Sequence, residues 1–219
     1  MKSQIKNYSI YLIGLFTASF GLALSTKAGL GTSPVASVAY SISLVNTHLS
    51  FGMWLNIWSL IQTGVEILLL RRRCKPVEII IQTALAFVYG YLTDFSGWLT
   101  RGLTADTYPG QFLIMLLGCF VVGLGIWIQF KGGVAMLPGE AMNRAISRVT
   151  GKRYENIKIL FDVLYIVIAA VICFAALGRL EGVREGSIIA ALLIGNIIKW
   201  YNRLFSHFFN GARYHKDST

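Results

Sequence analysis

Acidic, amide and basic side chains occur in or next to apolar stretches, where they could contact a solute or a proton. Glu140 and Asn143 are three residues apart, so a helix would place both on one face, with Arg144 one turn after Glu140. Asp162 lies about one turn into an apolar stretch, where an ionisable residue is a functional candidate by default. These groups could bind a cation, carry a proton or hold a polar solute. Two structural alternatives stay open: Glu140 pairs with Arg144, or Asp162 is an interfacial acid beside Lys158.

A second set of candidates belongs to a sequence element that occurs twice. GLFTASFGLALSTKAGLGTSP (14–34) aligns without gaps with GCFVVGLGIWIQFKGGVAMLP (118–138), with six identities in 21 positions. The offset is 104 residues, and self-similarity at a fixed offset indicates repeated structural units. The similarity continues more weakly beyond the element, where Asn56 falls near the position related to Asp162.

Each copy of the element ends in glycines and a proline, which predict a loop that leads into a helix. Glycine permits a tight turn, and proline suits the first turn of a helix. A helix N-terminus offers free N–H groups and partial positive charge, which suit an anionic or carbonyl group. The lysine in each copy would strengthen such a site if it turned inward; alternatively, both lysines snorkel to the interface. The residues predicted to bind the solute are Lys27, Gly29, Gly31, Pro34, Asn56, Lys131, Gly133, Pro138, Glu140, Asn143 and Asp162.

Long apolar segments must position these residues. The chain has 219 residues, of which 55% are hydrophobic and 14% charged, whereas a soluble domain carries about 25% charged residues. A helix needs about 20 apolar residues to cross about 30 Å of hydrocarbon. Six segments meet this requirement: about 8–27, 51–70, 78–98, 111–130, 158–177 and 186–206. We therefore predict an all-α polytopic membrane protein with one membrane domain over residues 1–219.

The segments that follow the two prolines are shorter, and the second carries several charges. Charged residues on a lipid-facing helix are costly, so we expect both segments to be half-helices that enter and leave on one side. The basic clusters at 71–75 and 148–158 and both termini then face the cytoplasm, as the positive-inside rule requires. Each repeat has three spans and one re-entrant half-helix, and an odd number of spans makes the repeats insert in opposite orientations. We therefore predict inverted repeats, about 8–98 and about 111–206.

The stretches GLALSTKAGLGTSP (21–34) and KGGVAMLPGE (131–140) resemble those of the YczE/YyaS/YitT group of bacterial membrane proteins. The similarity extends over most of the chain. The resemblance implies a location in the bacterial plasma membrane, and it implies no substrate or site residue.

These patterns favour a transporter or channel for a small polar or charged solute, bound between the two half-helix N-termini. The alternative is a non-transporting membrane subunit, either a substrate-binding component or an accessory of a larger complex. Motifs of hydrolases, metalloproteases and nucleotide-binding enzymes are absent from the sequence, so we expect neither enzymatic activity nor a cofactor.

The expected partners are the lipid bilayer and the solute, and homo-oligomerisation is left open. The net charge of +10 comes from basic residues in short polar gaps between spans, so nucleic acid is not an expected partner. Whether Asp94 pairs with Lys199, at similar depth in equivalent spans, also stays open.

Overall fold

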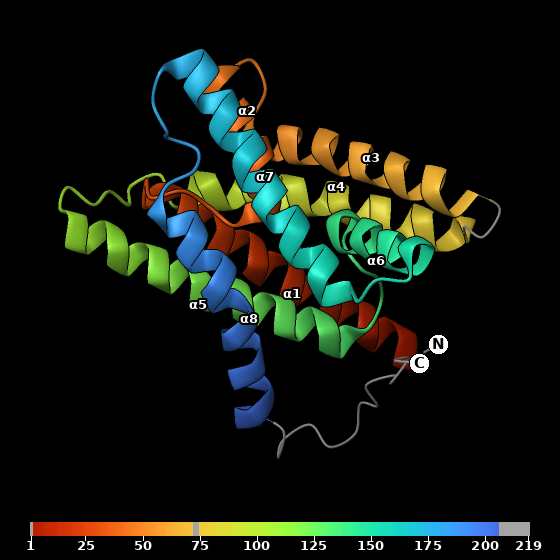
Figure 1. Ribbon diagram of the computed structural model, residues 1–219. Coiled ribbons are helices and arrows are strands. Elements are labelled where there is room, and N and C mark those ends of the chain that lie inside the picture. The colour runs from red at the N-terminus through yellow and green to blue at the C-terminus, as the bar shows by residue number, and fades with distance from the viewer. Residues whose placement is uncertain (1, 72–74, 206–219) are drawn as a thin grey trace.

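The computed structural model describes residues 2–71 and 75–205 and contains only helices and loops there (Figure 1). The helices are α1 (Lys2–Lys27), α2 (Pro34–Val45), α3 (Phe51–Leu70), α4 (Pro76–Leu99), α5 (Tyr108–Gly132), α6 (Pro138–Thr150), α7 (Tyr154–Leu177) and α8 (Glu185–Phe205). Residues 72–74 of the predicted basic cluster, and the C-terminal tail from residue 206, lie outside the described part.

Six of these helices are long and apolar enough to cross a membrane, which confirms the six predicted spans. Helices α2 and α6 have 12 and 13 residues, and at 1.5 Å per residue each is about 18 to 20 Å long, too short to cross. Every proline of the chain lies in the first turn of a helix: Pro34, Pro76, Pro109 and Pro138. A proline there loses no intrahelical hydrogen bond, so the sequence marks these helix starts.

The centre of the molecule is the antiparallel pair α1 and α5. A Cβ built on Gly14 would lie 2.8 Å from the carbonyl oxygen of Gly125, and one built on Gly118 would lie 3.0 Å from that of Gly21. Early residues of α1 therefore meet late residues of α5, at a separation that admits only glycine. Gly118 and Gly125 follow Gly14 and Gly21 by 104 residues, which is the offset between the two copies of the sequence element.

Two outer helices flank the central pair. Helix α4 packs along α1, and α8 packs along α5; Ser19 lies 3.3 Å from Ser96 in the first pair, and Gly123 contacts Ile197 in the second. Each short helix packs mainly against a span from the other half of the chain: α2 lies against α7, and α6 lies against α3.

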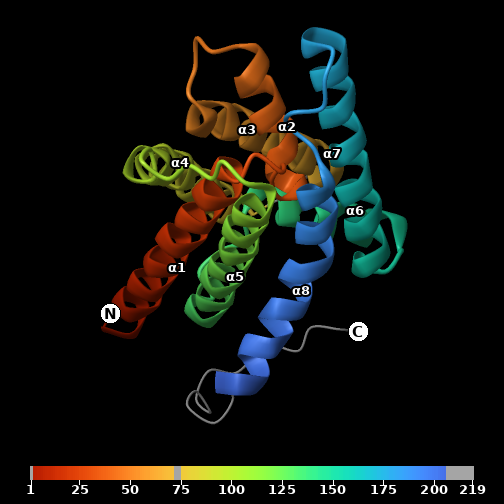
Figure 2. The same cartoon turned by 90° about the vertical axis from the view of Figure 1, so that its left-hand side faces the viewer.

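The last two helices of each half pack differently. Helices α3 and α4 pack along each other, and the backbone N–H of Gly52 donates a 2.7 Å hydrogen bond to Asp94 across this contact. Their counterparts α7 and α8 do not pack along each other, and α8 lies against α5 instead (Figures 1 and 2). Asp94 is thus bound to the start of α3, while Lys199 is exposed on α8, and no ion pair joins them among the described residues.

Candidate solute-binding site

The first turns of α2 and α6 meet in the interior of the molecule. Pro34 and Pro138 are both buried, and a Cβ built on Gly139 would lie 3.0 Å from Cγ1 of Val35. The carbonyl of Ser33 accepts the N–H groups of the third and fourth residues after it, and the corresponding bonds form at α6. Within the described residues, no acceptor is bound to the N–H of Val35 or of Gly139. We call this meeting point of the two helix starts, Pro34–Val35 and Pro138–Gly139, the junction.

Asn143 is the most isolated polar side chain of α6. It lies one turn after Gly139, its exposed fraction is 0%, and neither its Oδ1 nor its Nδ2 has a hydrogen-bond partner among the residues that the structure describes. The hydroxyl of Thr32, two residues before Pro34, is also buried without a partner. A buried polar atom without a partner costs about 1–3 kcal/mol. Unused hydrogen-bonding capacity thus belongs to two residues that are close in sequence to the helix starts at the junction.

The junction is surrounded by the two spans that the short helices contact, α3 and α7. Gln62 of α3 lies beside Gly139, and its Nε2 donates a 3.2 Å hydrogen bond to the hydroxyl of Tyr165 on α7. The ring of Trp58 packs edge-on against Tyr165, with ring centroids 5.8 Å apart. The Ser37 hydroxyl of α2 lies 3.4 Å from the Tyr165 carbonyl. None of these was a predicted site residue; Gln62 carries a signal as an amide in an apolar span, and Tyr165 carries none.

The two predicted acids lie on α6 and α7, close to each other. Glu140 is half-buried, and the charges of Lys158 and Asp162 act on its carboxyl group. Oδ2 of Asp162 forms an ion pair with Nζ of Lys158 at 3.5 Å. Among the described residues, Oδ1 of Asp162 is buried without a hydrogen-bond partner.

The alternative pairing of Glu140 with Arg144 does not form. No ion pair joins these two residues in the part of the chain that the structure describes, and Arg144 lies 3.8 Å from the sulfur of Met136 instead. The hydroxyl of Tyr11, on α1, is close enough to Glu140 for the two to interact electrostatically. This hydroxyl is buried without a partner among the described residues, so α1 adds a further polar atom near Glu140.

The two predicted lysines lie at helix ends, away from the junction. Lys27 is exposed at the end of α1 and lines a cavity of about 390 Å³ together with Tyr40, Asp94 and Arg101. Lys131, at the end of α5, holds its ammonium 5.4 Å from the centre of the Trp127 ring. Gly133, two residues after Lys131, caps the C-terminus of α5 with a positive φ of 59°.

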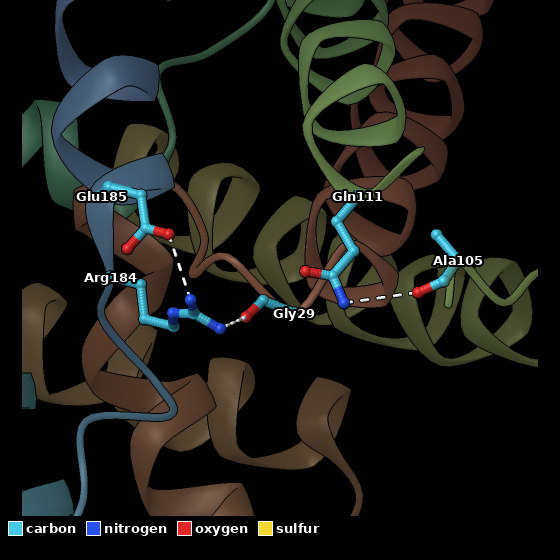
Figure 3. Close-up of polar contacts among 5 residues, drawn as sticks. All are labelled: Gly29, Ala105, Gln111, Arg184 and Glu185. Carbon is cyan, nitrogen blue, oxygen red and sulfur yellow. Dashed lines mark hydrogen bonds and ion pairs between the residues drawn. The ribbon is translucent and has the colours of Figure 1, made fainter. Parts of the chain in front are cut away.

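Gly29 and Gly31 anchor the loop that leads into α2. The Arg184 guanidinium donates to the Gly29 carbonyl at 3.2 Å and to Glu185 at 3.1 Å (Figure 3). Gly31 forms a β-bridge with Val183, and both glycines have positive φ values of 67° and 95°. Nearby, Gln111 donates to the Ala105 carbonyl at 3.3 Å and holds the start of α5 (Figure 3). These glycines thus set the position of the first turn of α2.

Asn56 lies apart from the other predicted site residues. It is buried on α3 and faces α4, where it contacts Gly90, and its Oδ1 has no partner. The structure thus brings Pro34 and Pro138 together and places Glu140 near Asp162, with Asn143 on the same short helix. It leaves the lysines, the loop glycines and Asn56 elsewhere.

Six apolar helices around buried polar groups define the class of the molecule: a polytopic helical membrane protein. A family model described as a family of unknown function (DUF6198) matches residues 5–203, and the chain belongs to this family. The chain is 25% identical over 206 residues to the uncharacterized membrane protein YczE of Bacillus subtilis (strain 168), covering 91% of this chain and 87% of YczE. It is 24% identical over 165 residues to the uncharacterized protein YyaS of the same organism, covering 75% and 80%. No solved structure matches this chain. The resemblance noted in the sequence is confirmed.

Proposed function

We propose that the protein is a transporter or channel for a small polar or charged solute, and that the solute binds at the junction of α2 and α6. The observation that carries this proposal is Asn143, which is fully buried with neither polar atom bonded. A bound solute would satisfy the donor and the acceptor of this side chain and so recover the free energy of the missing hydrogen bonds.

We further propose that the two halves are inverted repeats. The antiparallel packing of α1 and α5 supports this, because the contact between Gly14 and Gly125 is equivalent to that between Gly118 and Gly21. The packing of α2 on α7 and of α6 on α3 also supports it, because exchanging the two halves turns one contact into the other. Repeats of this kind are typical of transporters that bind a substrate near the bilayer midplane.

The proposal includes α2 and α6 as re-entrant half-helices that start at the junction and run to opposite faces. Helix α2 runs along α7 from Ser37, beside Tyr165, toward Ser41, which lies with Cys173 around Gly182. Irregular backbone at membrane depth is tolerated where protein buries it, and the loop before α2 is buried at Leu30 and Thr32.

Helix α6 follows the opposite course along α3. Gly139 lies beside Gln62, and further along the two helices the charge of Arg148 acts on Glu66. Helix α6 therefore runs from the junction toward the C-terminal end of α3.

The charges at the two ends of the bundle support an N-terminus in the cytoplasm. The end that carries the C-terminus of α1 is balanced, with Lys27, Arg101, Arg179 and Arg184 against Asp94, Asp106, Glu181 and Glu185. The opposite end carries a basic excess, including Arg71, Lys75, Lys131, Arg148, Lys152, Arg153, Lys158 and Arg203. Under the positive-inside rule the basic end faces the cytoplasm of a bacterial cell.

The chemistry of the junction suits a solute with an acceptor group and a donor group. The free N–H groups of Val35 and Gly139 and the positive ends of two helices favour an acceptor, such as a carboxylate or carbonyl. Asn143 can bond to both kinds of group. The neighbouring Glu140 and Asp162 disfavour a simple anion, so we propose a neutral polar or zwitterionic solute.

The experiment that tests this function uses the full chain in liposomes. Purified protein is screened for thermal stabilisation by amino acids, nucleosides and small amides, and the stabilising compounds are then used in uptake assays. Asn143→Ala is expected to abolish both stabilisation and uptake, while Asn156→Ala, at an exposed position on α7, leaves both unchanged. Uptake that is unaffected by Asn143→Ala would refute the site. Solute binding without uptake would favour the alternative, a substrate-binding subunit of a larger complex.

A further inference from the structure

A carboxylic acid that has no part in the junction is buried inside span α3. Glu66 has an exposed fraction of 7%, and Nε2 of Gln82 on α4 donates a hydrogen bond to its Oε2. Both residues lie on long apolar helices. A carboxylate in such a place is costly unless a cation or several donors compensate its charge.

Among the described residues, the groups that face Glu66 do not supply that compensation. From α4 they are the neutral amide of Gln82 and the charge of Glu78, and from α6 the charge of Arg148. Arg148 is exposed and lies beyond ion-pair distance, since among residues 2–71 and 75–205 no basic group lies within 4 Å of Glu66. Helix α2 contributes no acidic or basic side chain.

On α6, Gly139 lies beside Gln62, four residues before Glu66, and further along the charge of Arg148 acts on Glu66. The one hydrogen bond that the described residues give the Glu66 carboxyl group comes from Gln82 of α4.

We propose that Glu66 is a proton-binding site of the protein, protonated while α3 and α4 are packed together and deprotonated when they separate. On release, the carboxyl O–H bond breaks, the proton passes to water, and the electron pair stays on the carboxylate. The ligand is a proton, and the site couples it to the movement of α4.

The unequal packing of the two repeats supports the second half of this proposal. Helices α3 and α4 pack along each other, whereas the related pair α7 and α8 does not. If the repeats exchange conformations during transport, α7 and α8 close while α3 and α4 open, which exposes Glu66 and removes Gln82. This step rests on the proposed transport function; the protonation of Glu66 does not.

The test is the infrared spectrum of the purified full chain in lipid, in H₂O and in D₂O, with no solute required. At pH 7 the difference between the wild type and Glu66→Gln is expected to show the C=O band of a protonated carboxylic acid. This band should shift in D₂O, because the proton exchanges with solvent. Glu66→Gln keeps an acceptor for Gln82, so size-exclusion chromatography should show folded protein. The control Glu78→Gln, at an exposed residue paired with Lys75, should not remove the band.

Two results would overturn the inference. A difference spectrum that contains carboxylate bands at pH 7 would mean that Glu66 is ionised in the packed state. A carboxylic acid band that does not shift in D₂O would mean that its proton does not exchange, and Glu66 would then be a static structural acid. Neither result bears on solute binding at the junction, so the two proposals can fail separately.

Discussion

Substituting Gly14 and Gly118 by alanine, one at a time, tests the packing of α1 against α5. The new Cβ on Gly14 would lie 2.7 Å from the backbone nitrogen of Gln129 and 2.8 Å from the carbonyl oxygen of Gly125. The new Cβ on Gly118 would lie 2.9 Å from the nitrogen of Ser25 and 3.0 Å from the oxygen of Gly21. The Cβ on Gly118 would also meet Oγ of Ser25. A rotamer change can move that hydroxyl but not the backbone atoms, so the helices must move apart in both variants.

The expected loss of unfolding free energy is about 1–3 kcal/mol for each variant, the usual range for overpacking. The two losses should be similar, because the contacts are related by the exchange of repeats. The double variant should lose less than the sum, since the first substitution already separates the helices.

Unfolding of the purified protein by SDS, followed by tryptophan fluorescence, measures these losses. The matched control is Gly64→Ala, on the helix α3, where a Cβ would meet no atom within 4 Å. It should leave stability unchanged or raise it by up to about 1 kcal/mol. A loss at Gly118 without one at Gly14, or strictly additive losses, would mean that the two glycines do not pack in one shared contact between α1 and α5.

Three further predictions follow from the junction, its loop and the charge distribution. Asn143→Leu should stabilise the solute-free protein by about 1–3 kcal/mol, because two unpartnered atoms are removed, and should abolish uptake; a destabilised variant that still transports would contradict the site. Arg184→Gln, which removes the bond to the Gly29 carbonyl, should lower unfolding free energy by no more than about 1 kcal/mol because the pair with Glu185 is exposed. It should increase hydrogen exchange in the loop before α2, and unchanged exchange would refute the anchoring role. In a cysteine-free background, an impermeant thiol reagent outside cells should label Thr104→Cys and not Lys152→Cys; the reverse pattern would invert the topology.

The sequence was sufficient to predict the helices, because apolar length and proline position are local properties. Six spans follow from runs that cover the bilayer, and Pro34 and Pro138 mark the starts of the two short helices. The glycines at 14 and 118 indicate close packing, but their partners depend on how two distant helices cross, which the repeat alone does not specify.

The predicted site was less complete, since it depends on which side chains the packing brings together. Gln62 and Tyr165 meet only because α3 and α7 both contact the short helices, and no local pattern links them. The repeated element made Lys27 and Lys131 candidates for the site, with snorkelling to the interface as the alternative, and both lie at the ends of α1 and α5. Glu66 carried a signal, as an acid in an apolar span, that the repeat comparison did not use.

The most direct test of binding at the junction is solute protection of a cysteine placed there. In a cysteine-free chain in liposomes, Val35→Cys is alkylated with N-ethylmaleimide in the presence and absence of a transported solute, with Ser43→Cys near the end of α2 as the control. We expect the solute to slow alkylation at position 35 and not at position 43, and complete alkylation of position 35 to stop uptake. Unslowed alkylation at position 35, with uptake that continues after modification, would contradict binding at the junction.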